Sequence, residues 1–494
     1  MRNRHPYCAC LFCTTAAVVM AMLIFRISSP VNAADKPISF IDDVAPIIKE
    51  HCLACHEPKK KSGKYDMATF EKLMEGGANG EMIIPGKPEE SEFYTLIVTD
   101  EPRRMPPRDK GEAVSTDKAE IIRRWILQGA KLDSGIDPKA DLVKELRKRW
   151  KPPVPPQTYK FPVIINALAF TPDSKQLVVG GHHELTIWSA TDGKLLKRLH
   201  TRAERAYAVA FLRDGKLAVA GGRPGQEGDV RIYDLTAKPM AVDNGVEILD
   251  GVGNPQVMVA QLLDADDSVL CLAISADGKK LAAGGCDRAV RIWNLSDGPA
   301  KAALEQTIEN HADWVLGVQF SQDGKYLISA ARDKTAKVWD LTAKESVMTF
   351  PDHQNIVYSV TVSQDGSTGI SVGADKQLRT WKIGGDGKQL KAAGGHGDEV
   401  FKVVHSPTAP ILATSSADKT VRLWDLQKLS VTKTLAGMSD FVYAVTFSPD
   451  GSMVAAGAYN GEVRIWNVND GSERLAFNAS PGYRVSSVTT NSKP

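Results

Sequence analysis

The chain has 494 residues, a formal net charge of +2 at pH 7 and 24% charged residues. Binding to nucleic acid requires a concentrated basic face, so this balance gives no reason to expect a nucleic-acid partner. The length predicts several domains, and the 40 glycines are typical of a chain in which tight turns join many short strands.

Residues 1–33 have the pattern of an export signal. Arg2 and Arg4 precede an uncharged stretch from Tyr7 to Phe25, and small residues at 31–34 provide a cleavage point. An uncleaved signal anchor is the alternative, because the uncharged stretch approaches the ~20 residues that span a bilayer. Under either interpretation we expect an exported protein, periplasmic or otherwise extracytoplasmic, with no membrane span once the signal is removed.

The first folded segment is predicted to be a small, all-α domain over residues 36–133. Apolar residues from Phe40 to Cys55 recur every three or four positions, which indicates an amphipathic helix. The helix ends in the C-x-x-C-H pattern of Cys52, Cys55 and His56. Two thiols one turn apart can form thioethers to the two vinyl groups of a porphyrin, and the adjacent histidine then becomes an axial ligand of the iron. The pattern therefore predicts one covalent haem c.

Zinc and thiol-redox chemistry are the alternatives for this motif. A structural zinc site usually needs a second Cys/His pair, and residues 35–135 contain no other cysteine and one other histidine, His51. A thioredoxin-like site would need a βαβ context, which this segment lacks. Haem remains the favoured interpretation.

Met105 is the candidate for the sixth iron ligand. His51 abuts the attachment motif on the same side of the ring, which makes it a poor distal ligand. The proline after Met105 favours an extended loop that can present the thioether sulfur inward, and a soft sulfur ligand raises the reduction potential. The alternative is that Met105 packs in the core, and three other methionines are then rival ligands: Met67, Met74 and Met82.

A second helix is predicted to close this domain. Asp117 can cap it, with Glu120 three residues later, and Gly129 stands where the helix should stop. Between them, isoleucines and Trp125 form the buried face.

Residues 36–133 resemble the planctomycete-type cytochrome c domain. The resemblance lies in these motifs: Cys52-Leu53-Ala54-Cys55-His56, Ile84-Pro85-Gly86-Lys87-Pro88-Glu89-Glu90-Ser91, Arg104-Met105-Pro106-Pro107 and Trp125-Ile126-Leu127-Gln128-Gly129-Ala130. It implies one haem bound through Cys52 and Cys55, His56 as an axial ligand and Met105 as the sixth ligand. The sequence departs from the family at Lys64-Tyr65-Asp66, where related domains are more apolar.

Four lysines follow the motif closely: Lys59, Lys60, Lys61 and Lys64. They can form a basic rim that steers an acidic redox partner protein toward the haem edge, or they can belong to a solvated loop. Further along, residues 134–160 combine a short basic helical pattern with a proline-rich run, which predicts a linker.

Residues 161–494 are predicted to form an all-β propeller of seven blades. Seven segments of alternating pattern end in an aromatic residue: Trp188, Tyr233, Trp293, Trp339, Trp381, Trp424 and Trp466. Most spacings lie between 42 and 46 residues, which resembles the WD repeat, and Asp-Gly pairs provide hairpin turns. Residues 483–490 resemble a partial extra strand, which leaves the closure of the ring open.

Three of the repeats carry a matching polar set. These are His311, Ser329, Asp333 and Trp339; His353, Ser371, Asp375 and Trp381; and His396, Thr414, Asp418 and Trp424. A His–Asp–Ser catalytic relay is one interpretation, but an enzyme needs one nucleophile rather than three identical ones. The sets resemble the structural hydrogen-bond tetrad of WD proteins, which is the favoured interpretation.

Two insertions depart from the period, at residues 222–228 and at about 238–262. They indicate either a recognition face for a protein partner or tolerated surface loops. Cys271 and Cys286 can bridge, although small buried hydrophobic residues are the favoured interpretation.

Together these features predict an exported electron carrier with no catalytic residues and with the propeller as a platform for protein interaction. Two alternatives remain. One is a haem-dependent oxidoreductase acting on a substrate bound at the propeller, and the other is a haem-containing scaffold or sensor.

Overall fold

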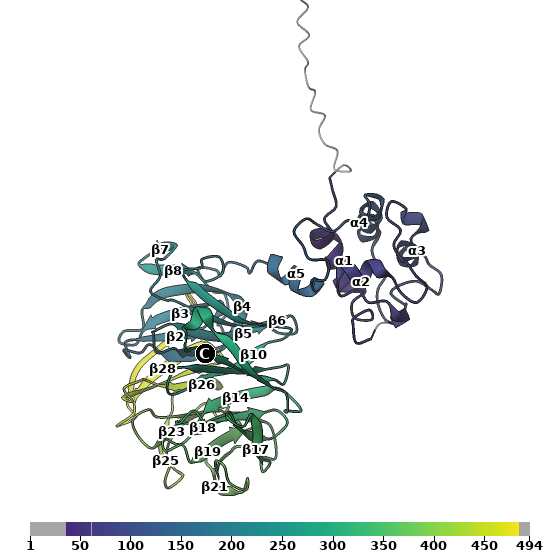
Figure 1. Cartoon of the computed structure of the whole chain (residues 1–494). Coiled ribbons are helices and arrows are strands. Elements are labelled where there is room, and N and C mark those ends of the chain that lie inside the picture. Colours follow the sequence, from purple (N-terminus) through teal and green to yellow (C-terminus); the bar gives the residue numbers. More distant parts are fainter. Residues whose placement is uncertain (1–35, 61, 484–494) are drawn as a thin grey trace, which may run out of the picture. The chain divides into compact units, whose positions relative to one another are not determined.

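The computed structural model describes residues 36–60 and 62–483, so the predicted export signal lies outside the described residues. The chain divides into two compact units, residues 1–150 and 151–494. This boundary falls within the stretch 134–160 for which the sequence predicts a linker. Figure 1 shows a small helical region followed by a large all-β region. No helix of the described part is long and apolar enough to cross a membrane.

The helical unit is built from short helices around one buried cluster of apolar side chains. Its aromatic centre joins Phe40 to Phe70 (ring centroids 4.9 Å apart) and to Trp125 (5.3 Å). The helices are η2 (Phe40–Val44), α1 (Ala45–His51), η3 (Ser62–Lys64), α2 (Phe70–Glu75), η4 (Pro88–Glu90), α3 (Glu92–Val98), α4 (Thr116–Leu127) and α5 (Leu142–Arg149).

The helix predicted from Phe40 to Cys55 is shorter in the structure. A wide turn, η2, begins it, and α1 ends at His51, so both motif cysteines lie in the turns that follow. Ser39 caps the start by accepting a hydrogen bond from the main-chain N–H of Asp42 (2.9 Å). The buried apolar face is confirmed, because Ile41, Val44 and Ile48 are fully buried.

The predicted second helix is α4, but its cap differs from the expectation. Ser115, not Asp117, is the N-cap residue, and its side chain accepts from the main-chain N–H of Lys118. Asp117 instead lies inside the first turn, where a carboxylate favours the positive end of the helix dipole. Gly129 follows the helix with a positive φ of 100°, as predicted for the residue that ends it.

The basic helical pattern after residue 134 forms α5, which packs on the helical unit. Leu142 is 1% exposed, and its main-chain N–H donates to the Ala68 oxygen (2.9 Å). Arg149 also forms an ion pair with Asp42 at 2.7 Å.

The all-β unit consists of one nine-stranded sheet followed by five four-stranded sheets. Within each four-stranded sheet, successive strands pair antiparallel in chain order. The four-stranded sheets contain β10 (Val269–Ile274), β11 (Lys280–Gly285), β12 (Val290–Asn294) and β13 (Ala303–Ile308); β14 (Val315–Phe320), β15 (Tyr326–Ala331), β16 (Ala336–Asp340) and β17 (Glu345–Phe350); β18 (Val357–Val362), β19 (Thr368–Gly373), β20 (Gln377–Lys382) and β21 (Gln389–Gly394); β22 (Val400–His405), β23 (Ile411–Ser416), β24 (Val421–Asp425) and β25 (Ser430–Leu435); and β26 (Val442–Phe447), β27 (Met453–Ala458), β28 (Glu462–Asn467) and β29 (Glu473–Asn478). A short helical turn, η5 (Pro299–Lys301), precedes β13.

The nine-stranded sheet is held together by one long strand, β4 (Leu195–Phe211). Its first part pairs with β3 and its last part, from Arg205 onward, pairs with β5. The other strands are β1 (Leu168–Phe170), β2 (Gln176–Gly180), β3 (His182–Ser189), β5 (Leu217–Arg223), β6 (Glu227–Tyr233), β7 (Ala241–Asp243), β8 (Val246–Asp250) and β9 (Met258–Ala265).

Neither predicted insertion is a free loop. Residues 222–228 form the end of the β5–β6 hairpin, where Arg223 pairs with Glu227. Within residues 238–262, the β7–β8 hairpin adds β8 in parallel to the outer side of β4. Both segments extend the sheet because their main-chain groups are paired.

The predicted Asp-Gly turns are confirmed in four sheets. Between β10 and β11, the Ser275 hydroxyl donates to Asp277 Oδ1 (2.6 Å), and Gly278 adopts a positive φ of 74°. The same serine–aspartate bond recurs at Asp323, Asp365 and Asp450, each followed by a glycine with positive φ. Glycine suits this position because it adopts a positive φ without the strain that a side chain adds, although Ser174 has the same conformation (φ 62°) in the corresponding turn after Asp173.

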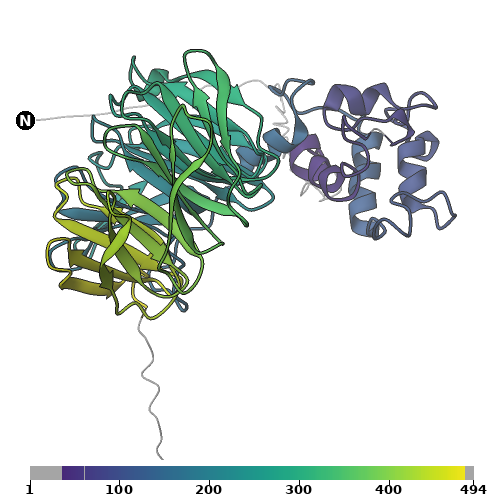
Figure 2. The same ribbon diagram turned by 90° about the horizontal axis from the view of Figure 1, so that it is seen from below.

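The first and last sheets of the all-β unit pack against each other. One buried cluster combines residues from β1, β2 and β3 with residues from β26 to β29, including Trp188 against Phe477 (5.0 Å between ring centroids). Ile165 also donates its main-chain N–H to the Ala458 oxygen (3.2 Å). Figure 2 shows the blue and yellow ends of the unit adjacent to each other. The possible extra strand of residues 483–490 lies outside the described residues, apart from Tyr483.

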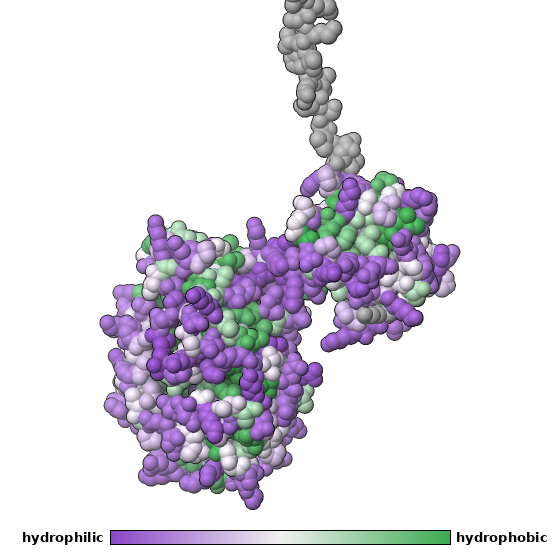
Figure 3. Space-filling model, in the orientation of Figure 1, coloured by the Kyte–Doolittle hydropathy of each residue, from purple (hydrophilic) through white to green (hydrophobic). Residues whose placement is uncertain are grey.

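The face of the all-β unit seen in Figure 3 is mainly hydrophilic, with apolar patches between the polar side chains. Cys271 is buried and Cys286 is half-buried, and both are free thiols rather than a disulfide.

Candidate functional site

The C-x-x-C-H segment forms a compact turn at the end of α1. The main-chain N–H groups of Cys55 and His56 both donate to the Cys52 oxygen at 3.1 Å, and Cys52 donates to the Ile48 oxygen at 2.9 Å. Cys52, Cys55 and His56 are each half-buried. The structure therefore places the three predicted residues together on one turn.

Cys52 faces the apolar cluster of the helical unit. Burial and, to a smaller extent, the neighbouring Cys55 raise the pKa of the Cys52 thiol to about 12. A thiol with so high a pKa is protonated at neutral pH.

His56 is oriented by the main chain of a neighbouring segment. Its Nδ1 lies 3.1 Å from the Tyr65 carbonyl oxygen. A carbonyl can only accept, so Nδ1 donates this hydrogen bond, and in the neutral ring Nε2 is then the nitrogen with the lone pair. Metal-bound histidines are commonly held in this way, with the second ring nitrogen bonded to a carbonyl or carboxylate. The donor set of two thiols and one free imidazole nitrogen fits a covalently bound haem.

Tyr65 contacts His56 directly, which the sequence analysis did not predict. Its side chain is 3% exposed, and its hydroxyl donates to the Leu73 oxygen at 2.7 Å. Its ring contacts the His56 ring edge to face, with centroids 5.7 Å apart. The segment that departs from the family pattern, residues 64–66, thus holds the histidine through its backbone. A backbone acceptor leaves no residue-type signal in a sequence.

Met105 is in the loop after α3, tied by its main-chain N–H to the Leu96 oxygen (2.8 Å). The Arg104 guanidinium braces this loop by donating to the main-chain oxygens of Pro106 and Gly111 at 3.1 Å. The Met105 side chain is 38% exposed and lies outside the buried cluster that Cys52 contacts.

The rival methionines occupy different environments. Met67 is 4% exposed, and Met74 and Met82 pack against the buried cluster. Their thioethers therefore fill the core, whereas that of Met105 remains accessible. His51 contacts Lys118 Nζ through its Nε2 at 3.2 Å.

One of the three described lysines of the basic rim, Lys60, has hydrogen-bond or ion-pair partners. Lys60 donates to the Ala54 oxygen (2.8 Å) and lies 3.9 Å from Glu57, while Lys59 and Lys64 are exposed. Lys61 lies outside the described residues.

The three polar sets in the all-β unit form hydrogen-bond tetrads, as favoured from the sequence. In the first, His311 Nδ1 bonds to Asp333 (2.8 Å), and His311 Nε2 bonds to Ser329 Oγ (2.7 Å). Trp339 Nε1 donates a hydrogen bond to the same Ser329 Oγ (2.9 Å). The sets of His353 and His396 repeat this pattern with contacts between 2.7 and 3.2 Å. Ser329 is 0% exposed, so the hydroxyl is a structural bridge and not an accessible nucleophile.

No group of three or more His, Cys, Asp or Glu side chains within the described ranges is arranged to hold a metal ion.

Comparison with known proteins identifies both units. Residues 52–109 match the family model of planctomycete cytochrome C. Residues 258–294, 303–340, 344–382, 387–425 and 429–467 match the model of the WD domain, G-beta repeat. The chain therefore joins a cytochrome-like domain to a domain of WD repeats.

A curated relative resembles part of the chain. Protein groucho of Drosophila melanogaster is 27% identical over 137 residues, which is 27% of this chain and 16% of groucho. The chain thus spans about a sixth of the length of this relative.

Proposed function

We propose that the helical unit is an all-α cytochrome domain that holds one haem, attached through Cys52 and Cys55 and ligated by His56, and that it transfers electrons. The observation that carries the proposal is the hydrogen bond between His56 Nδ1 and the Tyr65 oxygen, beside two thiols on the same turn. This bond leaves Nε2 available to iron and fixes the direction of the ring.

Each residue has a distinct role in this proposal. Cys52 and Cys55 anchor the porphyrin to the end of α1, and Tyr65 sets the tautomer of His56. Haem supplies reversible one-electron exchange at its iron. Met105 is the proposed sixth ligand, because its accessible thioether lies on a braced loop that can present it without disturbing the core. A closed coordination sphere favours electron transfer over substrate chemistry at the metal.

We propose that the all-β unit is a seven-bladed propeller. Because β4 pairs with β3 along its first part and with β5 along its last part, the nine-stranded sheet divides into two blades that share this strand. With the five four-stranded sheets the total is seven. WD repeats in general, and the likeness to groucho, support a role as a platform for protein partners.

We also propose that the protein is exported. The charged start and uncharged stretch of residues 1–33 support this, and thioether attachment of haem fits an extracytoplasmic protein. The exposed Lys59 and Lys64 beside the motif fit an acidic redox partner.

The test is a haem stain of the denatured full chain, expressed with a cytochrome c maturation system. We expect a haem band that survives denaturation and a mass increase of one porphyrin. The double variant Cys52→Ser/Cys55→Ser should lose the band, whereas Cys286→Ser, at a half-buried thiol of the other unit, should retain it. A colourless wild-type band, or a mass equal to that of the polypeptide alone, would overturn the proposal.

A further inference from the structure

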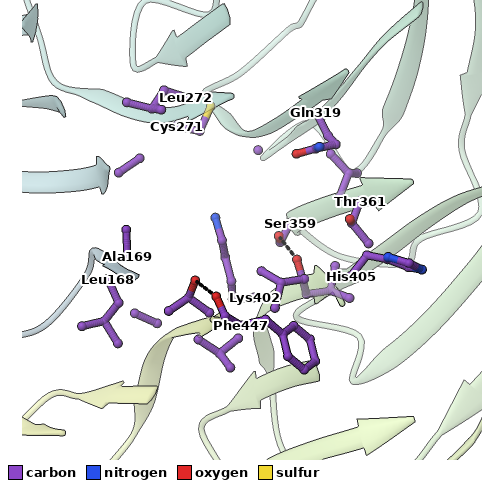
Figure 4. A pocket seen from close by; sticks show the side chains of 18 of the residues that line it. Leu168, Ala169, Cys271, Leu272, Gln319, Ser359, Thr361, Lys402, His405 and Phe447 are labelled. Atoms are coloured by element: carbon purple, nitrogen blue, oxygen red, sulfur yellow. Dashed lines mark hydrogen bonds between the residues drawn. The ribbon is translucent and has the colours of Figure 1, made fainter. Parts of the chain in front are cut away.

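The all-β unit encloses a central cavity of about 580 Å³, here called the inner cavity. The strands that line it are β1, β4, β10, β14, β18, β22 and β26. Figure 4 shows the Lys402 side chain extending from β22 into this space, with its amino group between Ala169, Cys271 and Ser359. Lys402 is the one lysine, arginine, aspartate or glutamate among the described residues that line the inner cavity.

Lys402 breaks a repeated pattern of small residues. The strands can be aligned on a β-bulge that six of them share. In each of these six, the bulge directly precedes the residue that occupies the register position of Lys402 in β22. The seven residues at this position are Ala167, Ala208, Cys271, Gly317, Ser359, Lys402 and Ala444. Six of the seven strands thus carry a small side chain, and the seventh places an amine in the space that the others leave open.

The Lys402 amino group has no partner in the part of the chain that the structure describes. No hydrogen bond or ion pair joins it to another described residue, and burial lowers its pKa. Cys271 is a titratable group whose charge would act on Lys402, but burial raises the pKa of that thiol to about 12, so it does not supply a negative charge. The Lys402 side chain is half-buried and has lost part of its water, and a bound anion would offset that loss.

A second hollow of about 580 Å³, here called the mouth, adjoins the inner cavity. Asn166, Tyr207 and Lys402 line both spaces and lie where the two meet. The mouth is strongly aromatic, with Tyr358 and Phe401 5.4 Å apart and Phe401 and Tyr443 4.6 Å apart between ring centroids. An apolar molecule can therefore pack against rings on the way to Lys402.

The two carboxylates of the mouth are already engaged. Asp398 forms an ion pair with Lys376 at 3.2 Å, and Glu399 accepts a hydrogen bond from the Tyr358 hydroxyl at 2.8 Å. Neither is bonded to Lys402, which leaves its charge for a ligand. Asn166 and Gln319 add side-chain amides to the cavity wall.

We propose that the inner cavity is a binding site for a small organic monocarboxylate with an apolar body, held by an ion pair with Lys402. The volume lies in the range of ~300–1,000 Å³ typical of small-molecule sites. A single positive charge matches a single carboxylate, and the aromatic mouth matches the apolar body of the ligand. The site is independent of the proposed haem, because all of its residues belong to the all-β unit.

The first test is calorimetric titration of the full chain with 3-phenylpropionate, hexanoate and octanoate, and with their neutral amides. We expect at least one carboxylate to bind with a Kd below about 1 mM and its amide to bind at least ~10-fold more weakly, since the charge-assisted bond to the Lys402 amine is lost. Absence of binding by all three carboxylates, or equal binding of acid and amide, would overturn the proposal.

The second test uses two lysine variants. Lys402→Ala restores the side chain found at this position in three other strands, so the fold should tolerate it. Carboxylate affinity should fall at least ~10-fold in this variant. Lys382→Ala, at an exposed lysine of β20, should leave the affinity unchanged. Equal affinity of Lys402→Ala and the wild type would refute the role of Lys402.

A third measurement does not depend on any variant folding. Reductive methylation of the wild-type chain, mapped by mass spectrometry, reports the accessibility of each lysine amine. A binding carboxylate should protect Lys402 from methylation and leave Lys382 reactive, whereas its amide should protect neither. Equal methylation of Lys402 with and without the carboxylate would contradict the proposed ion pair.

Discussion

Gly369 of β19 lies directly opposite Trp381 of β20, and the indole ring occupies the space where a side chain at position 369 would be. A Cβ atom at this position would lie 2.3 Å from the ring, and Trp381 is fully buried. The tetrad tryptophan of this sheet is therefore packed against bare backbone.

We predict that Gly369→Ala destabilises the all-β unit by about 1–3 kcal/mol or more, because the buried indole has no free space into which to move. The free energy of unfolding can be measured by urea denaturation followed through tryptophan fluorescence. Gly397→Ala is the matched control, since its Cβ would meet nothing closer than 3.8 Å. Equal stability of the two variants would contradict this packing.

The second prediction concerns acid stability. Burial opposes ionisation of Asp375, but hydrogen bonds from His353 and Arg379 outweigh it and lower the pKa of Asp375 from 3.8 to about 2. A carboxyl group with a lowered folded-state pKa stabilises the fold above its unfolded-state pKa, and this contribution disappears as the pH falls through the folded-state value.

Asp375→Asn should therefore reduce stability at neutral pH by about 1–2 kcal/mol, and the gap to the wild type should narrow as the pH falls from about 4 to about 2. Urea denaturation at a series of pH values measures both curves. If they remained parallel over this range, the charge of Asp375 would contribute nothing to the tetrad.

The third prediction concerns the buried ion pair between Arg198 and Glu184. Arg198 contacts both carboxylate oxygens of Glu184, at 2.6 and 2.8 Å, and also donates to the Pro156 oxygen. Tyr159 donates its hydroxyl to the same carboxylate at 2.6 Å. This cluster fastens the chain that enters the all-β unit to β3 and β4.

Arg198→Met should cost about 3–5 kcal/mol of unfolding free energy, because the carboxylate of Glu184, itself 1% exposed, loses its counter-ion. Thermal or urea unfolding measures the loss. Lys194→Met removes the exposed pair with Asp192 and should leave stability almost unchanged. A loss in the first variant no larger than in the second would show that the pair is dispensable.

The fourth prediction follows from the proposed haem ligation. Met105→Ala in the matured protein should open the sixth coordination position, so that carbon monoxide binds to the reduced form, and should lower the reduction potential. Absorption spectra and a redox titration measure both effects. Met74→Ala, at a methionine packed against the core, should leave them unchanged. An unaltered spectrum in Met105→Ala would exclude this residue as the ligand.

Local patterns in the sequence predicted the features that depend on local chemistry. The buried face of Ile41, Val44 and Ile48, the Asp-Gly turns and the three tetrads each arise from residue types at fixed spacing, and the structure confirms them. The cap of α4 was assigned two residues late because serine and aspartate are both good caps, and spacing alone did not distinguish Ser115 from Asp117.

Features that depend on tertiary pairing were not predictable in this way. The role of Tyr65 is exerted through a main-chain oxygen, which every residue possesses. The insertion at 238–262 was interpreted as a loop because the residues of β4 that pair with β8 lie 50 positions earlier in the chain. The sequence does distinguish Lys402, because the residues at the six equivalent positions are small. The difference becomes visible only when the inner strands are aligned in register.

The continuity of β4 has a consequence for how this chain can be cut and rejoined. Circular permutation succeeds at exposed turns, where new termini break few main-chain bonds. The serine–aspartate turns at Asp277, Asp323, Asp365 and Asp450 provide such places. The middle of β4 does not, because a cut near Arg205 would sever a strand whose two halves belong to different pairings.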